Sequence, residues 1–277
     1  MNIIIKNIHG ERVLTGDGGG NIGITKISGI SNPPYEIKKY TSFDFDGAIE
    51  SARRIPSRGI TLAGDIKGDT KAVKEFLKIL SDPFDMIVIG DDEREIRIAS
   101  ANCEINKIEK NISKFVISCI ADDPYFYDSD ETKVALFERE ELVDKNLTLP
   151  SMFSKRTATA GIKVNSDRII EPKIVITGKN TESQEDGRIV IINEKTKAEF
   201  VLLYTPEENE IITVDVKQRQ ITSDKNGNII SSMTLDSFMS DLEIGTEGAT
   251  FSLVGYGKAS NISAYIIYKN CYLEAIA

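Results

Sequence analysis

Short runs of apolar residues, several of them alternating with polar ones, dominate the first half of the chain. Ile3–Ile5, Gly59–Ile66 and Met86–Ile89 are runs of this kind, and turn-forming residues separate them. Ile96–Ile108 and Ile112–Ile120 have the pattern of two hairpin arms. Because a period of two is typical of strands that bury one face, the pattern predicts a sheet of short strands.

One segment of the first half has helical spacing instead. Val73, Phe76, Leu77 and Leu80 recur at intervals of three and four, which places them on one helix face. Asp69 precedes the segment and is a good N-cap, and the following Asp-Pro pair ends it. The sequence therefore predicts a single helix packed on the sheet.

The second half has a β-like pattern throughout. From Thr157 onward, short apolar runs are punctuated by Gly, Asn, Asp and Pro, and Ser223–Gly227 contains the Asn-Gly pair favoured in tight hairpins. Many short strands at this spacing predict a β-sandwich. The expected strands are Gly161–Val164, Lys173–Thr177, Arg188–Ile192, Glu199–Leu203, Ile211–Val216, Arg219–Thr222, Asn228–Ser231, Thr250–Val254 and Ala264–Tyr268.

A charged stretch separates the two halves. Residues 128–155 contain Asp128–Thr132 and Glu138–Glu141, with a short strand expected near Val134–Leu136. Charged and polar composition is typical of a connector. We therefore expect a domain over 1–127, a connector over 128–155 and a second domain over 156–277, with Ala264–Glu274 as a last strand that could return to the first domain.

Composition narrows the class of protein. The chain has 277 residues, 40% of them hydrophobic and 28% charged, with a net charge of −9. These values fit a soluble globular protein. No run of apolar residues in the sequence is long enough to span a membrane. A general nucleic-acid binder would need a basic face, which the acidic balance argues against. The three cysteines are odd in number and lie in strand-like runs, so free thiols and a reducing compartment during folding are expected.

The candidate chemical motifs are weak. Gly16–Gly20 lacks the Gly-Lys-Ser/Thr of a phosphate-binding loop, and Asp224–Asn228 begins like a calcium loop but has Ile229 where glycine belongs. His9 is the single histidine, and Cys119 has no histidine near it in sequence. Turns and core packing explain these residues better. We expect no enzymatic activity, no cofactor and no bound metal.

A set of short segments along both halves resembles the phage distal tail protein (Dit) family. Cys119–Phe126, which closes the first half, is the most specific of them. The others are Asp46-Gly47, Arg54–Leu62, Phe76-Leu77 with Leu80, Asp82-Pro83, Arg94–Arg97, Cys103-Glu104, Gly161–Gly178, Arg188–Asn193 and Leu242–Phe251.

This resemblance implies a fold and a function. The fold would be mainly β, with an N-terminal belt domain and a peripheral galectin-like β-sandwich. Copies of the chain would form a hexameric ring between the tail tube protein and the tail-tip hub protein, leaving a channel for DNA. The implied location is the virion, after synthesis in the bacterial host cytoplasm, and receptor-binding or side-tail proteins are further implied partners. Contractile tails and phage-like bacteriocins stay open as alternatives.

A second class of function is a carbohydrate-binding module on a scaffold, because the implied sandwich is lectin-like. The chain has no tryptophan to form a sugar platform. Weaker aromatic platforms could come from Tyr204, Tyr256, Tyr265 and Tyr268. A fold alone does not establish sugar binding.

Two arginines near the start of an expected strand are candidates for subunit contact. Arg54 and Arg58 flank Ile55–Ser57. A solvated edge is the simpler interpretation, because arginine is common on surfaces. The sharper hypothesis is an inter-subunit clamp onto the acidic residues Asp91, Asp92 and Glu93, made by the bidentate guanidinium fork.

The end of the first domain offers a candidate junction. Pro124 ends a strand because it cannot donate a ladder hydrogen bond, and Tyr125 and Phe126 add large apolar area. An ordinary strand end with two core aromatics is one interpretation. We favour a pin that holds the connector on the domain, since the residues from Asp128 to Glu131 look too polar to anchor themselves.

Overall fold

The structure, a computed structural model, describes residues 1–16, 20–33, 35–41, 46–109, 111–141, 154–157, 159–179 and 186–275. The chain divides into two compact units. Unit 1 comprises Met1–Ser129 and Cys271–Ala277, and unit 2 comprises Asp130–Asn270. Unit 2 is therefore inserted, in sequence, between two parts of unit 1.

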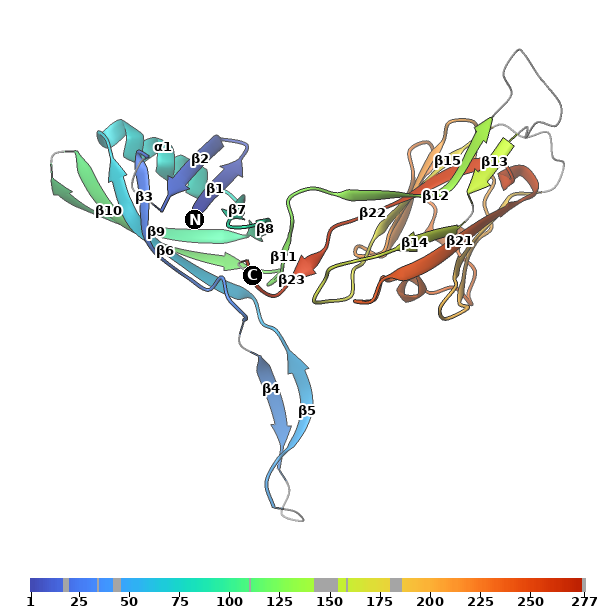
Figure 1. The fold of residues 1–277 in the computed structure, drawn as a ribbon, viewed down its shortest axis with the longest axis horizontal. Coiled ribbons are helices and arrows are strands. Elements are labelled where there is room, and N and C mark those ends of the chain that lie inside the picture. The colour runs from blue at the N-terminus through green and yellow to red at the C-terminus, as the bar shows by residue number, and fades with distance from the viewer. Residues whose placement is uncertain are drawn as a thin grey trace. The chain divides into compact units, whose positions relative to one another are not determined.

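Unit 1 is built on a ten-stranded sheet, in the order β23-β11-β8-β7-β1-β2-β3-β6-β10-β9, with a separate two-stranded hairpin, β4-β5 (Figure 1). The β-strands are β1 (Asn2–Asn7), β2 (Gly10–Thr15), β3 (Ile22–Ser28), β4 (Glu36–Tyr40), β5 (Ile49–Arg54), β6 (Arg58–Lys67), β7 (Phe84–Ile89), β8 (Glu93–Ile98), β9 (Ser100–Glu109), β10 (Ile112–Ala121), β11 (Phe126–Asp128) and β23 (Cys271–Tyr272).

The expected helix is present as α1 (Thr70–Leu80). The Asp69 carboxylate caps it by accepting hydrogen bonds from the backbone N–H groups of Lys71 and Ala72 at 3.0 and 3.1 Å. Phe76 packs from the helix onto Phe115 of β10, with ring centroids 5.3 Å apart. The helix thus packs on the sheet as predicted, but it does so through Phe76, Ile79 and Leu80, whereas Leu77 of the expected face is exposed.

The alternation in β6 and β10 explains how the core forms. Ile60, Leu62, Gly64 and Ile66 of β6 are buried, as are Phe115 and Ile117 of β10, while the alternate residues between them are partly or fully exposed. The two strands pair antiparallel over their whole length. Strands of period two therefore present one apolar face to α1 and the rest of the core.

Unit 2 is a β-sandwich of a seven-stranded sheet, β13-β12-β22-β15-β18-β19-β20, and a four-stranded sheet, β14-β21-β16-β17. Its elements are β12 (Thr132–Glu141), β13 (Ser154–Thr157), β14 (Thr159–Ile162), β15 (Lys173–Gly178), β16 (Arg188–Asn193), β17 (Glu199–Leu202), β18 (Ile211–Asp215), β19 (Gln220–Ser223), β20 (Gly227–Asn228), β21 (Ala249–Tyr256) and β22 (Ile262–Tyr268), with 3₁₀ turns η1 (Ile230–Ser232), η2 (Met239–Leu242) and η3 (Gly257–Ala259). Both sheets contribute to one apolar core.

Four expectations about the elements need correction. The long arm Ile96–Ile108 is two strands, since β8 pairs with β7 and β9 pairs with β10. The described part of the connector is not a linker, because β12 pairs with β22 in the seven-stranded sheet. The expected strand Asn228–Ser231 is largely the turn η1. The last expected strand is also divided: β22 stays in unit 2, while β23 pairs with β11 in unit 1.

Candidate functional site

The hairpin β4-β5 is exposed at every position of both strands. The pairing runs from Glu36↔Arg54 at the root to Tyr40↔Ile49 near the tip. Figure 1 shows it projecting from the ten-stranded sheet of unit 1.

Large apolar side chains lie on this exposed hairpin. Ile37 is 40% exposed and Ile49 is 58% exposed. A two-stranded hairpin is marginally stable in water unless a third strand or another surface covers it. An exposed apolar surface of this kind is typical of an interaction site.

The two strands carry more positive than negative charge. Four basic side chains, Lys38, Lys39, Arg53 and Arg54, are present beside the two acidic ones, Glu36 and Glu50. The chain as a whole has a net charge of −9. The hairpin is therefore more basic than the chain as a whole, and it would be complementary in charge to an acidic surface.

The structure separates the two arginines that the sequence grouped. Arg54 lies on the hairpin, where its Nη2 is 2.7 Å from Oε2 of Glu36 and its side chain is 77% exposed. Arg58, four positions later, begins β6 and is only 3% exposed. Arg54 remains a candidate for contact with a second subunit.

Arg58 makes its contacts inside unit 1. Its Nε donates to the Pro124 carbonyl at 2.6 Å, its Nη1 to the carbonyls of Gly29 and Ser31 at 2.9 Å each, and its Nη2 to the Leu273 carbonyl at 2.5 Å. Burial lowers the pKa of Arg58 to about 10. Since these bonds occupy the guanidinium on three sides, the expected clamp from Arg58 to another subunit is wrong.

The acidic residues of the expected clamp lie around the start of β8. Asp92 Oδ2 is 2.8 Å from Nη2 of Arg94 in the same chain, and Glu93 accepts a hydrogen bond from the Ser129 hydroxyl at 3.2 Å. Asp91 is exposed. Their contact with Arg54 of a second subunit stays a prediction, with Asp92 the least available because it already has a cationic partner.

Two of the expected junction residues, Pro124 and Phe126, contact Arg58. The Phe126 side chain is fully buried, and the Arg58 guanidinium carbon lies 4.8 Å from its ring centroid. Pro124 contributes the carbonyl described above, and Tyr125 is half-buried. Asp128, expected to be too polar to anchor itself, is instead held by an ion pair with Arg94 at 2.9 Å.

Sequence reasoning missed the second arginine of this junction. Arg94 is 8% exposed, and its guanidinium carbon lies 3.6 Å from the ring centroid of Tyr272 in β23. Burial raises the pKa of Tyr272 to about 12, and the negative charge of Asp128 adds to the shift. Alternating burial in β8 could have marked Arg94 as inward-facing, but its partner Tyr272 follows unit 2 and leaves no local signal.

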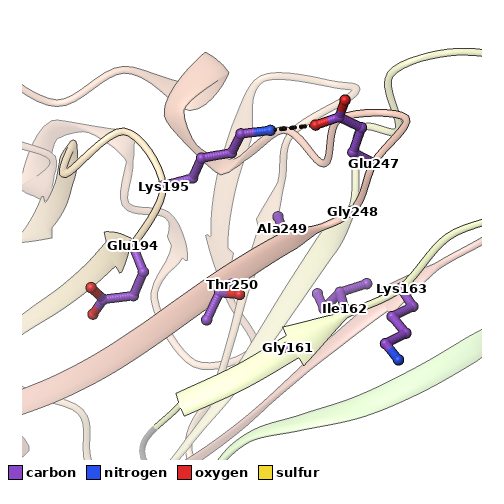
Figure 2. Close-up of a pocket in the computed structure, with 9 residues that line it drawn as sticks. All are labelled: Gly161, Ile162, Lys163, Glu194, Lys195, Glu247, Gly248, Ala249 and Thr250. Atoms are coloured by element: carbon purple, nitrogen blue, oxygen red, sulfur yellow. Dashed lines mark hydrogen bonds and ion pairs between the residues drawn. The ribbon is translucent and has the colours of Figure 1, made fainter.

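A hollow of about 490 Å³ lies on the outer surface of the unit 2 sandwich. Its floor is formed by small residues of β14 and β21, and the Lys195 and Glu247 side chains meet at its rim with a separation of 2.8 Å (Figure 2). The lining comprises Gly161, Ile162, Lys163, Glu194, Lys195, Glu247, Gly248, Ala249 and Thr250. Aromatic residues are missing from this lining, so the hollow does not favour the carbohydrate-binding alternative.

The weak chemical motifs take structural roles. His9 Nε2 lies 2.6 Å from Oδ2 of Asp82 in a surface contact, and Cys119 is a free, buried thiol whose pKa burial raises to about 12. Across the described parts of the chain, no group of His, Cys, Asp or Glu is arranged to hold a metal ion. Within the same ranges, no helix is long and apolar enough to cross a membrane.

Comparison with known proteins gives a fold relationship. No protein-family profile matches the sequence, and no characterised protein matches it by sequence. The solved structures similar to it include the Dit (gp 19.1) protein of phage SPP1, described as a paradigm of the hub adsorption apparatus in phages that infect Gram-positive bacteria. The TM-score is 0.66 at 12% identity, over 91% of this chain and 94% of that one.

One chain of the phage P2 baseplate in its activated conformation is also similar, in structures with calcium and with strontium. The TM-scores are 0.52 and 0.51 at 12% and 13% identity, and each match covers 96% of this chain and 97% of the other. This chain thus has a mainly β, Dit-like fold over nearly its whole length.

Proposed function

We propose that this chain is a structural component of a phage tail, and that six copies form a ring joining the tail tube to the tail-tip hub. The observation that carries the proposal is the exposed hairpin β4-β5, on a chain whose fold is shared with phage hub and baseplate proteins. In a monomer the hairpin has no other surface to cover it, whereas in a ring it can pack on the neighbouring subunit.

The proposed interface between subunits joins two different surfaces. The hairpin is cationic and partly apolar, and it would contact a different, acidic surface of the next copy. A contact between two different surfaces is heterologous, and repetition of a heterologous contact closes into a ring when the rotation is suitable. Six copies is the number that the resemblance to the Dit family implies.

A ring of this kind would leave a channel for DNA. Each subunit has a net charge of −9, so the assembled ring is strongly negative. A negative lining repels phosphate groups, which lets DNA pass without being bound. The proposed partners are further copies of the chain, the tail tube protein and the tail-tip hub protein, with receptor-binding or side-tail proteins attached; the proposed location is the virion, and we propose no enzymatic activity.

Negative-stain microscopy and native mass spectrometry test this proposal. Purified protein at rising concentration, alone and with the tail tube protein, is expected to give six-fold rings and a hexamer mass. A variant with residues 36–54 replaced by a short Gly-Ser linker is expected to stay monomeric while keeping its melting temperature. Another symmetry, a monomer under both conditions, or rings from the hairpin-less variant would contradict the proposal.

A further inference from the structure

Arg58 lies where both legs of the β4-β5 hairpin leave the ten-stranded sheet. The last pair that joins the preceding strand β3 to β6 is Ser28↔Thr61. Arg58 follows the hairpin by a few residues, and it donates back to the carbonyls of Gly29 and Ser31 on the opposite leg. One side chain therefore ties the two legs together at the root of the hairpin.

The backbones of the two legs are also in close contact there. Gly29 has φ +86°, and a Cβ added to it would lie 2.1 Å from the Gly59 carbonyl oxygen. Glycine is needed because no other residue fits this spacing and conformation. The backbone of the two legs is thus fixed at the root. The root therefore sets the direction in which the hairpin extends from the sheet.

A third segment completes this root from far along the sequence. The Leu273 carbonyl accepts from Nη2 of Arg58, and the Ala275 backbone N–H donates to the Ile30 carbonyl at 2.9 Å. Ala275 is 3% exposed. We call residues 271–275 the return segment, because they rejoin unit 1 after unit 2.

A buried guanidinium depends on every acceptor around it. Moving a charge out of water is unfavourable unless hydrogen bonds replace the lost hydration. The Arg58 guanidinium donates to four backbone carbonyls, one of them in the return segment. Loss of the return segment would leave a buried donor unsatisfied and would loosen the other three bonds.

We infer that Arg58 is a positioning residue for the hairpin, and that the return segment completes its site. The hairpin reaches its assembly-competent orientation only when residues 271–275 are bound at its root. Ring formation is thereby coupled to synthesis and folding of the chain beyond unit 2. The inference rests on the proposed function for its consequence, ring formation, but the coupling itself concerns unit 1 alone.

Two variants separate the components of this coupling. Arg58→Met removes the donors, and Ala275→Glu displaces the return segment while leaving Arg58 in place. Arg54→Met is the matched control, because Arg54 is on the hairpin and exposed. Arg58→Lys is a graded variant, since one ammonium group reaches fewer carbonyls than a guanidinium does.

Hydrogen exchange of residues 29–33 and 54–58 is the direct readout, with ring yield by native mass spectrometry as the second. Arg58→Met and Ala275→Glu are expected to speed exchange at the root by at least about tenfold relative to the rest of unit 1, and to lower ring yield. Arg58→Lys is expected to be intermediate, and Arg54→Met to leave exchange at the root unchanged.

The outcomes decide between the two proposals. Unchanged exchange at the root in Ala275→Glu would overturn the coupling, as would a rise in Arg58→Met that is uniform over unit 1. Wild-type ring yield despite a loosened root would overturn the positioning role. If the hairpin-less variant forms rings, the proposed function fails, but exchange at the root still tests the coupling. Should Arg58→Met not fold, Arg58→Lys and Ala275→Glu supply the same comparison.

Discussion

The Nη2 atom of Arg58 donates to the carbonyl of Leu273 at 2.5 Å, across a separation of 215 residues. Unit 2 lies in sequence between these two residues. Unit 1 is therefore completed by a segment that follows the whole of unit 2. A cut in the charged stretch after β12 would fall inside unit 2, and we do not expect it to release two intact units, contrary to the simple connector that the composition suggests.

Truncation of Phe126 should destabilise unit 1. The side chain is fully buried and lies against the Arg58 guanidinium. Phe126→Ala is expected to lower the free energy of unfolding of unit 1 by about 3–5 kcal/mol, the usual cost of removing a buried phenylalanine. Urea unfolding followed by hydrogen exchange would resolve unit 1 from unit 2.

Phe200→Ala is the matched control, because Phe200 is equally buried in the core of unit 2. It should destabilise unit 2 and leave unit 1 unaffected. Ordinary surface substitutions change the free energy of unfolding by less than about 0.5 kcal/mol. If Phe126→Ala lowers the free energy of unfolding of unit 1 by no more than that, Phe126 is not the apolar anchor of the junction.

Two glycines at the hairpin root should respond oppositely to alanine. Gly29 has φ +86° and a carbonyl oxygen 2.1 Å from the position of an added Cβ, whereas Gly59 has nothing within 4 Å. Gly29→Ala is expected to cost about 1–3 kcal/mol or more, because a strained backbone and a clash combine. Gly59→Ala should be neutral or slightly stabilising, since alanine restricts the unfolded chain.

Thermal unfolding of both variants checks this pair. Equal melting temperatures for Gly29→Ala and Gly59→Ala would show that the two legs are not fixed at the root. Circular dichroism of the folded proteins controls for global misfolding. The comparison is useful because the two glycines face each other across the same contact.

The parts of the fold that follow local patterns could be predicted from the sequence. The helix was predicted because Asp69 caps a segment whose apolar spacing matches one face, and β6 because its residues alternate. The hairpin β4-β5 was missed because Glu36–Tyr40 and Ile49–Arg54 are exposed on both faces and carry no alternation. Strands without a buried face give no periodic signal.

The candidate site was only partly predictable for a related reason. Arg54 and Arg58 are close in sequence and of one type, yet one is exposed and the other buried. What distinguishes them is the set of backbone carbonyls around Arg58, which come from segments far apart in the chain. Backbone acceptors are present at every residue, so sequence cannot show where they converge.

Apolar residues of the hairpin should govern self-association without affecting stability. Ile37→Ser with Ile49→Ser is expected to reduce ring yield by about tenfold or more, because two apolar contacts are lost at each interface. The melting temperature should stay within the range of surface substitutions, about ±0.5 kcal/mol in unfolding free energy. Analytical ultracentrifugation over a concentration series measures the association.

Ile8→Ser is the matched control for this pair. Ile8 is 89% exposed in the β1–β2 turn, so it tests whether removing any exposed isoleucine weakens association. An equal loss of association in Ile8→Ser would place the interface elsewhere. Unchanged association in the Ile37→Ser, Ile49→Ser variant would show that these two residues are not part of the subunit interface.

A buried carboxylate should make unit 2 sensitive to acid. Glu210 is fully buried, and its carboxylate accepts hydrogen bonds from the Ser223 hydroxyl, from the Tyr204 hydroxyl at 2.5 Å and from the backbone N–H of Glu207 at 2.7 Å. Burial alone would raise the pKa of Glu210, but these hydrogen bonds outweigh it and hold the pKa below its ordinary value of 4.5. The ionised form is therefore favoured by folding.

The sign of the pH dependence follows from that shift. A carboxylate whose pKa is depressed in the folded state contributes stability that is fully present above its unfolded pKa and is lost as the pH falls through the folded value. Unit 2 should therefore keep this contribution at pH 7 and lose it progressively below the ordinary pKa of 4.5.

Glu210→Gln should reveal this contribution. It is expected to cost about 1–3 kcal/mol at pH 7, because an amide cannot accept all the bonds that the carboxylate accepts. The difference from the unmodified protein should shrink as the pH falls below 4.5, where the native carboxylate itself becomes protonated. Glu208→Gln, two positions away and exposed, is the control and should leave the melting temperature unchanged at every pH. A Glu210→Gln penalty that is the same at pH 7 and at low pH would show that packing, not the ionised carboxylate, is what the substitution removes.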